Sequence, residues 1–212
     1  MVRRHFSLLM ALSLLTGISL ARAATPRPAS ILILGDSLSA EYGLQRGQGW
    51  VALLQARLDQ EKIAAHAINA SISGDTTSGG RSRLPALLAL HKPDLVMIEL
   101  GGNDALRGLP LAMTQDNLQA MTVAAKAAGA KVLLLGMQVP PNYGQAYANQ
   151  FADSFSQVAK EQQVALVPFL LKGVADGPNS ATMFQADRIH PLAQAHPIIL
   201  NTLWPSIKKL LR

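Results

Sequence analysis

The sequence contains no cysteine, so disulfide bonds, thiolate metal sites and a thiol nucleophile are all excluded. Aromatic residues make up only 5% of the chain, and no basic run is interleaved with them, which argues against a nucleic-acid-binding surface. Beyond the N-terminus, no apolar run is long enough to span a bilayer. With 49% hydrophobic residues, the chain is expected to fold as a soluble domain that packing alone stabilises.

The first 23 residues have the pattern of a secretory signal peptide. Arg3 and Arg4 precede the apolar stretch 6–21, and residues 21–23, Ala-Arg-Ala, have the small-x-small form of a signal-peptidase site. A retained membrane anchor is the alternative, but the apolar stretch is short for a bilayer span. The resemblance of "RRHF" to a twin-arginine signal is partial, so the export route stays open. We therefore expect a bacterial protein that is exported to the periplasm or secreted.

Removal of residues 1–23 changes the charge balance. Three arginines leave with them, which lowers the count of Lys and Arg from 19 to 16, against 13 Asp and Glu. This excess of positive charge is too small to indicate a nucleic-acid partner. The 189 residues that follow are the size of one domain, so we expect a short linker at 24–30 and a single domain at 31–212. We expect this domain to be a monomer with no stable insertion into a membrane.

Strand and helix patterns alternate from residue 31 to the end of the sequence. Strands are predicted at residues 31–35, 63–71, 93–101, 130–137 and 164–169, and helices at residues 49–62, 78–92, 114–129, 145–162 and 191–211. Thr114 is expected to cap the third helix, and Pro197 and Pro205 are expected to bend or interrupt the last one. Because the strands are apolar on both faces, the pattern predicts an α/β domain of three layers around a central parallel sheet of about five strands.

In such a sheet, ligands bind beyond the carboxyl ends of the strands. Ser37 follows the first strand in "GDSLS", Gly74 follows the second in "NASISGDT", and Asn103 follows the third in "GGND". A serine hydroxyl becomes a good nucleophile when a base accepts its proton. In "DRIHP", Asp187 precedes His190 by three residues, a spacing that lets the carboxylate reach the imidazole Nδ1 from a turn. The N–H groups of Ser37 and Gly74 and the Asn103 amide are three candidate donors to an oxyanion.

Each of these residues also has a purely structural interpretation. Ser37 can cap a helix, Gly74 can serve a left-handed turn, and Asn103 can brace a loop. Asp187 and His190 can form an ordinary surface pair. The joint pattern favours catalysis, because it supplies every residue type that acyl transfer needs at predicted strand ends or a C-terminal turn. "GDSLS" lacks the second glycine of the G-x-S-x-G elbow, so the pattern is not that of an α/β-hydrolase.

The stretches "GDSLS", "NASISGDT", "GGND" and "DRIHP" resemble, in order and spacing, the four sequence blocks of the GDSL or SGNH hydrolase family. The match runs from Ile31 to about Pro197, which is most of the predicted mature chain. More narrowly, "NASISGDT", "RLPALL", "ELGGND" and "LRG" are similar to bacterial periplasmic members of that family described as thioesterases, proteases, lysophospholipases and arylesterases.

The resemblance implies a flavodoxin-like three-layer fold and a serine hydrolase without a cofactor. It also implies a role for each candidate residue. Ser37 would be the nucleophile, His190 the base and Asp187 the partner that orients the base. Ser37, Gly74 and Asn103 would form the oxyanion hole.

Two apolar loops at the same end of the predicted sheet suit a groove for an acyl chain or an aromatic ring. Residues 105–113 follow Asn103, and residues 137–144 follow the fourth strand. Leu109 and Pro140 are therefore candidate substrate-binding residues. The alternative is that both only close the core beneath their loops.

The remaining polar residues do not form a second site. Asp36 and Asp104 neighbour the candidate catalytic residues, and each is expected to hold its loop by hydrogen bonds to the backbone. His66, His91 and His196 are scattered without ligand spacing, so no metal site is expected.

The sequence thus predicts a serine esterase that hydrolyses lysophospholipids, acyl thioesters or simple carboxylic esters through an acyl-enzyme. Because exported enzymes meet little acyl-CoA, an oxygen ester is favoured as substrate. Two alternatives stay open. One is an acetylesterase that acts on polysaccharide or cell-wall acetyl groups, and the other is a non-catalytic periplasmic module that binds lipid or glycan on the same fold.

Overall fold

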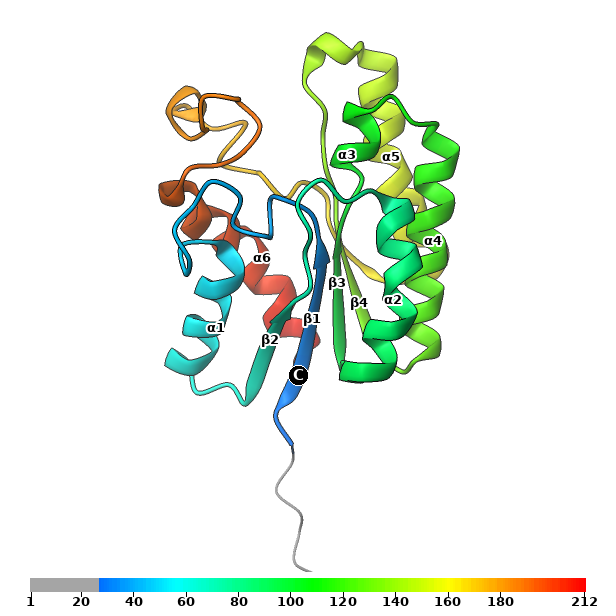
Figure 1. Cartoon of the computed structure of the whole chain (residues 1–212), viewed down its shortest axis with the longest axis vertical. Helices are drawn as coiled ribbons and strands as arrows, with labels where there is room; N and C mark the ends of the chain where they lie inside the picture. Colours follow the sequence, from blue (N-terminus) through cyan, green and yellow to red (C-terminus); the bar gives the residue numbers. More distant parts are fainter. Residues whose placement is uncertain (1–26) are drawn as a thin grey trace, which may run out of the picture.

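The computed structural model describes residues 27–212 (Figure 1), so the predicted signal peptide at 1–23 lies outside the described residues, as does the start of the linker. Five parallel strands form one sheet in the order β2-β1-β3-β4-β5. The strands are β1 (Ala29–Gly35), β2 (Ala65–Asn69), β3 (Leu95–Glu99), β4 (Lys131–Leu135) and β5 (Ala165–Val167). This order is the flavodoxin-like one. The predicted three-layer α/β fold is confirmed.

The three central strands are buried on both faces, which explains their near-continuous apolar sequences. β1 is buried from Ser30 to Gly35, and all five residues of β3 are buried. Leu32 of β1 lies opposite Val96 of β3, in the middle of the core. β2 lies at the edge of the sheet, where it pairs with β1, and it is less buried than the central strands, since Ala65 is its one buried residue.

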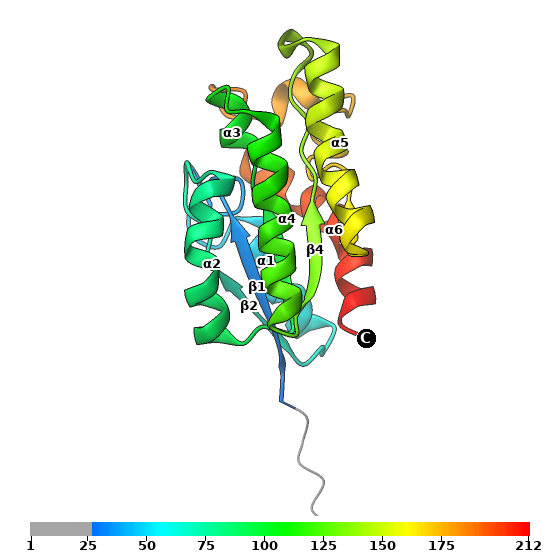
Figure 2. The same cartoon turned by 90° about the vertical axis from the view of Figure 1, so that its right-hand side faces the viewer.

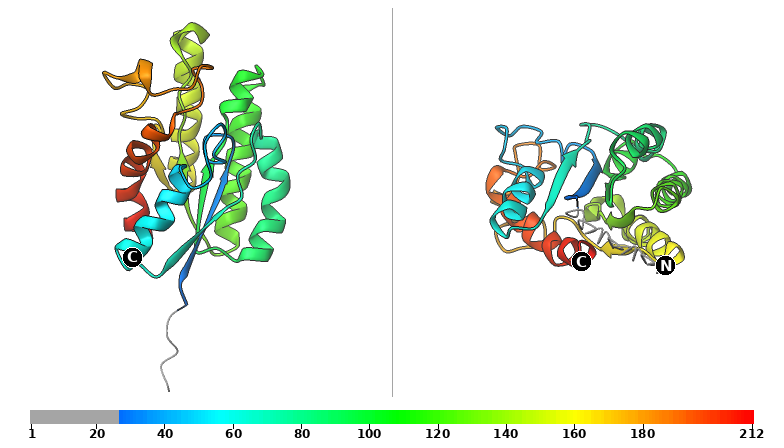
Figure 3. Two further views of the ribbon diagram at one scale, coloured as in Figure 1. Left: turned by 60° about the vertical axis from the view of Figure 1, so that its left-hand side comes forward. Right: turned by 90° about the horizontal axis from the view of Figure 1, so that it is seen from below.

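Helices cover both faces of the sheet. On one face lie α1 (Trp50–Gln60) and α6 (His196–Leu210), and on the other lie α2 (Thr77–His91), α4 (Leu111–Ala127) and α5 (Gln145–Gln162). Figure 2 shows the second group as a continuous layer in front of the strands, and Figure 3 shows the two groups on opposite sides of the sheet. One short helix, α3 (Gly102–Leu106), lies above the sheet at the carboxyl end of β3, where the sequence predicted a loop.

Three details of the helices differ from the sequence predictions. Thr114 is not a cap, because α4 begins at Leu111 after Pro110 and Thr114 lies buried within its first turns. Pro197 lies in the first turn of α6, where its missing N–H would have had no helical partner. Pro205 does not interrupt α6, which continues from His196 to Leu210. Packing of its apolar face against the sheet and α1 outweighs the one backbone hydrogen bond that this proline removes.

The carboxyl ends of all five strands lie at the same edge of the sheet, the upper end in Figure 1. The loops there are long. Residues 36–49 follow β1, residues 100–110 include α3, and residues 136–144 and 168–192 follow β4 and β5. Among the described residues, no helix combines the length and apolar character that a membrane crossing requires.

Candidate active site

The stretch that follows β1 is a tight turn rather than the start of a helix. The carbonyl of Asp36 accepts hydrogen bonds from the N–H groups of Ser39 and Ala40, and the Asp36 Oδ1 accepts one from the N–H of Leu38 at 3.1 Å. The turn requires glycine at position 35, because a Cβ there would lie 2.7 Å from a carboxyl oxygen of Glu99. The turn leaves Ser37 half-buried at the end of the sheet, between buried neighbours.

Three side chains form a hydrogen-bonded chain across this edge. The Ser37 Oγ lies 2.8 Å from His190 Nε2, and His190 Nδ1 lies 2.7 Å from the Asp187 Oδ2. Ser37 and His190 are 153 positions apart in the chain, and the orange segment of Figure 1 lies beside the blue turn that follows β1. The structure therefore brings together the three residues that the sequence predicted as nucleophile, base and orienting partner.

The electrostatics of Asp187 fix which nitrogen of His190 carries the proton. Burial alone would raise the pKa of Asp187, but hydrogen bonds from the N–H groups of His190 and Ile189 and from the His190 ring lower it to about 2. An ionised carboxylate only accepts hydrogen bonds, so Nδ1 carries a proton, and in the neutral imidazole the lone pair is then on Nε2. A ring in this state can accept the proton of the Ser37 hydroxyl.

Two residues that the sequence analysis missed hold His190 in place. The Tyr42 ring lies against the imidazole, with ring centroids 4.3 Å apart. The backbone N–H of Gln185 donates to the His190 carbonyl at 2.8 Å, and its side-chain amide donates to the Tyr42 carbonyl at 2.9 Å. Gln185 therefore ties the loop that carries His190 to the turn that carries Ser37. Neither role has a sequence signal, because each depends on contact between distant loops.

The three candidate oxyanion donors also lie at this edge. Within the described part of the chain, the N–H groups of Ser37 and Gly74 have no hydrogen-bond acceptor. Gly74 has a φ of +80°, a left-handed conformation that glycine adopts without strain. Asn103 lies in α3, and its Nδ2 donates to the Asp36 Oδ2 at 2.9 Å. An amide nitrogen carries two hydrogens, so the second remains for a ligand oxygen.

A pair of buried carboxyl groups lies directly beneath the turn. Burial raises the pKa of Asp36 to about 6, although hydrogen bonds from the N–H of Leu38 and from Asn103 oppose this increase. Burial also raises the pKa of Glu99 well above its usual range, and repulsion from Asp36 adds to the effect. A Glu99 oxygen accepts hydrogen bonds from the Ser39 hydroxyl at 2.7 Å and the Asp36 N–H at 3.2 Å. These hydrogen bonds hold the turn against the end of β3.

Ser37 and His190 open into a cavity of about 1240 Å³. Pro140 lines this cavity, as the sequence predicted, whereas Leu109 does not. The difference arises because α3 places Leu106 on the cavity side, and the chain then turns so that the Leu109 N–H donates to the Asp104 carbonyl. The apolar residues that line the cavity include Leu106, Met137, Val139, Phe151, Phe169, Leu171, Phe184 and Ile189.

The other polar residues have structural contacts. Asp104 is buried and accepts hydrogen bonds from the Thr77 N–H and hydroxyl and from the Thr114 hydroxyl, so it ties α2 to α4 rather than only bracing its own loop. His196 is buried, and its Nδ1 accepts a hydrogen bond from the Trp50 N–H at 3.0 Å. No group of three or more His, Cys, Asp or Glu side chains that could hold a metal ion occurs within residues 27–212.

Several known proteins are similar to this chain in sequence. The chain is 54% identical to the esterase TesA of Pseudomonas aeruginosa over 86% of its length and 89% of that protein. It is 44% identical to an arylesterase of Vibrio mimicus, over 84% of this chain and 87% of that one. It is also 41% identical to the thioesterase 1/protease 1/lysophospholipase L1 of Escherichia coli, over 85% of this chain and 84% of that one.

Solved structures show the same architecture. A crystal structure of TesA superposes with a TM-score of 0.82, covering 85% of this chain and 99% of that one. The esterase EstA of Pseudoalteromonas, solved with a monoethylphosphonate inhibitor, superposes with a TM-score of 0.81 at 44% identity, covering 86% and 98%. The GDSL-like lipase/acylhydrolase family matches residues 33–198 of the sequence. The chain therefore belongs to this family of serine ester hydrolases.

Proposed function

We propose that Ser37 is the nucleophile of an exported esterase, His190 its general base and Asp187 the group that orients the base. The observation that carries this proposal is the hydrogen-bonded chain from Asp187 through His190 to Ser37, which opens into the large cavity. The Ser37 oxygen attacks the ester carbonyl carbon while His190 Nε2 takes the hydroxyl proton. The tetrahedral intermediate then collapses, and the leaving alcohol or thiol takes the proton from His190.

The second half of the reaction uses the same groups. A water molecule gives a proton to His190 as its oxygen attacks the acyl-serine. When this intermediate collapses, the bond from the acyl carbon to the Ser37 oxygen breaks, Ser37 takes the proton back from His190, and the carboxylic acid is released. In both halves the carbonyl oxygen becomes negatively charged. The backbone N–H groups of Ser37 and Gly74 and the second hydrogen of the Asn103 amide are the donors that we assign to this oxyanion.

The cavity supports an acyl chain of medium or long length as the preferred substrate group. Its volume of about 1240 Å³ far exceeds the need of an acetyl group, and its apolar lining suits an alkyl chain. Leu106 and Ile189 line it and are also among the exposed large apolar residues, so the entrance is apolar too. We therefore place lysophospholipids and other amphiphilic oxygen esters ahead of acetylated polysaccharides. The relatives are named as an esterase and as a thioesterase and lysophospholipase, which agrees with this order.

We also propose that the enzyme acts as a monomer after export. All of the residues in the proposed mechanism come from one chain, so no second copy is needed to complete the site. Gel filtration with light scattering should give the mass of one mature chain. N-terminal sequencing of the exported protein should begin after Ala23, and an N-terminus at residue 1 would refute the signal-peptide assignment.

The first experiment compares initial rates on acetyl, butyryl, octanoyl and palmitoyl p-nitrophenyl esters and on lysophosphatidylcholine, with Ser37→Ala as the blank. We expect rates that persist or rise with chain length and vanish in Ser37→Ala, together with one fluorophosphonate bound per wild-type chain. Activity confined to acetyl esters would replace the proposal with an acetylesterase. Full activity of Ser37→Ala would show that another group is the nucleophile.

A further inference from the structure

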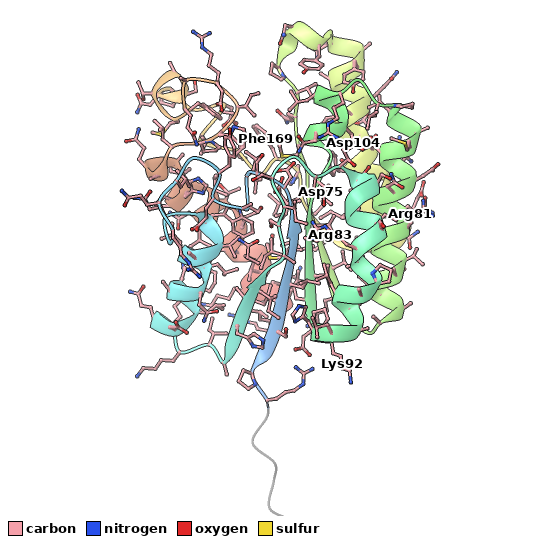
Figure 4. All side chains as sticks on the ribbon, in the orientation of Figure 1. Asp75, Arg81, Arg83, Lys92, Asp104 and Phe169 are labelled. Carbon is pink, nitrogen blue, oxygen red and sulfur yellow. The ribbon has the colours of Figure 1, made fainter. Side chains whose placement is uncertain are left out.

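Arg83 of α2 lies at the junction of three segments near the active site. Its Nε donates to the Asp75 Oδ2 at 2.7 Å, its Nη2 donates to the Gly35 carbonyl at 3.2 Å, and its Nη1 donates to the Ala70 carbonyl. Figure 4 shows Arg83 and Asp75 side by side at the upper end of the sheet. The arginine side chain is only 20% exposed and that of Asp75 only 12%. Solvent therefore screens this ion pair less than an ordinary surface pair.

The three acceptors belong to the two segments that carry the backbone oxyanion donors. Gly35 ends β1, two residues before Ser37. Ala70 directly follows β2, and Asp75 directly follows Gly74. A planar guanidinium with five N–H donors can hold a carboxylate and two carbonyls at once, which the single ammonium of a lysine does with much less directional control.

Besides the pairing of β1 with β2, three hydrogen bonds join the two segments directly, and one of them runs from the Asn69 amide to the Ser39 carbonyl at 2.8 Å. The N–H of Ile72 donates to the Gly35 carbonyl at 3.0 Å, and the N–H of Ala70 donates to the Ile33 carbonyl at 2.9 Å. From Ser71 to Asp75 the chain leaves the sheet. Gly74 has a positive φ, and a glycine has no side chain that would restrict its backbone conformation. Without Arg83, the position of the Gly74 N–H relative to Ser37 would depend on the backbone of this glycine turn and on Arg107, whose Nη2 donates to the Gly74 carbonyl at 2.8 Å from the exposed side.

We propose that Arg83 is a positioning residue for ester hydrolysis, which sets the distance and angle between the N–H groups of Ser37 and Gly74. This inference rests on the oxyanion roles proposed above for those two groups. A hydrogen bond to an oxyanion stabilises the transition state only when the donor is already in place. Arg83 touches neither substrate nor reacting atoms, so it acts through the loop that it holds.

The test uses Arg83→Lys, which keeps the positive charge near Asp75 but loses the planar fork. Arg81→Lys is the matched control, since Arg81 lies two positions earlier on α2 and donates instead to the Asn117 side chain of α4 at 3.1 Å. Figure 4 shows both arginines on the same helix. The measurements are kcat and KM on octanoyl p-nitrophenyl ester, the affinity for an alkyl boronic acid, and the number of sites that a fluorophosphonate labels.

We expect Arg83→Lys to lower kcat by about 10- to 100-fold with little change in KM, because an error of about 1 Å in a catalytic group has effects of that size. Affinity for the boronic acid should fall by a similar factor, because its tetrahedral adduct places a negatively charged oxygen in the oxyanion hole. One fluorophosphonate should still label each chain, and Arg81→Lys should behave like the wild type.

Asp75→Asn provides a second variant that keeps the size of the side chain. If Arg83 acts through Asp75, the double variant should lose little more activity than the worse of the two single variants. Unchanged kcat in Arg83→Lys would overturn the proposal. An equal fall in kcat and in the number of labelled sites would also overturn it, because that result means that part of the protein is unfolded and that the oxyanion donors are not misplaced. Activity in Ser37→Ala would instead refute the proposed nucleophile, so the two failures are distinguishable.

Discussion

Asp36→Asn should change how the stability of the protein depends on pH. The Asp36 side chain is buried beneath the turn that carries Ser37, with only 2% of its surface exposed, and its pKa of about 6 lies above the value of about 3.9 for a free aspartate. The folded state therefore holds this proton more tightly than the unfolded state does. The corresponding stabilisation is complete below about pH 4 and is lost as the pH rises through about 6.

The magnitude follows from the difference between the two pKa values. At about 1.4 kcal/mol for each pKa unit, the wild type loses about 3 kcal/mol of unfolding free energy from this group between pH 4 and pH 7. The asparagine of the variant has no proton to lose in this range. The difference in unfolding free energy, variant minus wild type, should therefore rise by about 3 kcal/mol over the same interval. Loss of the hydrogen bond from Asn103 adds an offset that does not depend on pH.

The assay is urea unfolding of both proteins at several pH values from 4 to 8, followed by the fluorescence of Trp50 and Trp204. Asp153→Asn is the control, because Asp153 is an exposed aspartate on α5. The difference in unfolding free energy between Asp153→Asn and the wild type should change far less with pH. Asp36→Asn also removes the repulsion that adds to the raised pKa of Glu99, so the measured difference reports the Asp36–Glu99 pair. A flat difference for Asp36→Asn, or one that falls with pH, would refute the reasoning.

Three further substitutions test the site and its support. Asp187→Asn should lower kcat by about 10³- to 10⁴-fold in steady-state kinetics without unfolding the protein, because the amide no longer fixes the proton of His190 at Nδ1; activity within tenfold of wild type would contradict this. Leu106→Asp should shift the preference among p-nitrophenyl esters towards short acyl chains, whereas Leu109→Asp should leave it unchanged, since only Leu106 lines the cavity; equal profiles would count against the acyl groove. Gly136→Ala should lower the unfolding free energy by about 1–3 kcal/mol in urea, because its Cβ would meet the backbone oxygen of Pro168, and an unchanged urea midpoint would count against this.

The order of the layers was predictable from the sequence because hydrophobic periodicity reports burial directly. The strands of the sheet are short apolar runs, and the predicted helix at 145–162 agrees with α5 at both ends. The ends of other elements were less predictable. Thr114 has the residue type of a cap, but its hydroxyl is used by Asp104 inside the fold, and the helix begins earlier after Pro110. At this position the hydrogen bond to Asp104 outweighs the preference of threonine for a helix cap.

The candidate catalytic residues were predictable for a different reason. Parallel strands bring their carboxyl ends to one edge, so Ser37 and Asn103 had to lie near each other once their strands were assigned. The individual residues that line the cavity were not predictable from the sequence. Leu106 and Leu109 are equally apolar in the sequence, and only the short helix α3 decides which of them faces the cavity.

Glu99 carried a signal that the sequence analysis did not use. It is a carboxyl group at the end of the apolar run of β3, a central strand of a parallel sheet that is buried on both faces. An ionised group in such a strand is unfavourable unless a partner or a proton neutralises it. A glutamate there must therefore either be neutral or meet polar groups from a neighbouring strand. In this register its neighbour on β1 is Gly35, where the turn that carries Ser37 begins. The same argument extends to Arg83, because a cation on a helix that covers the carboxyl end of such a sheet has backbone carbonyls and a loop carboxylate within reach.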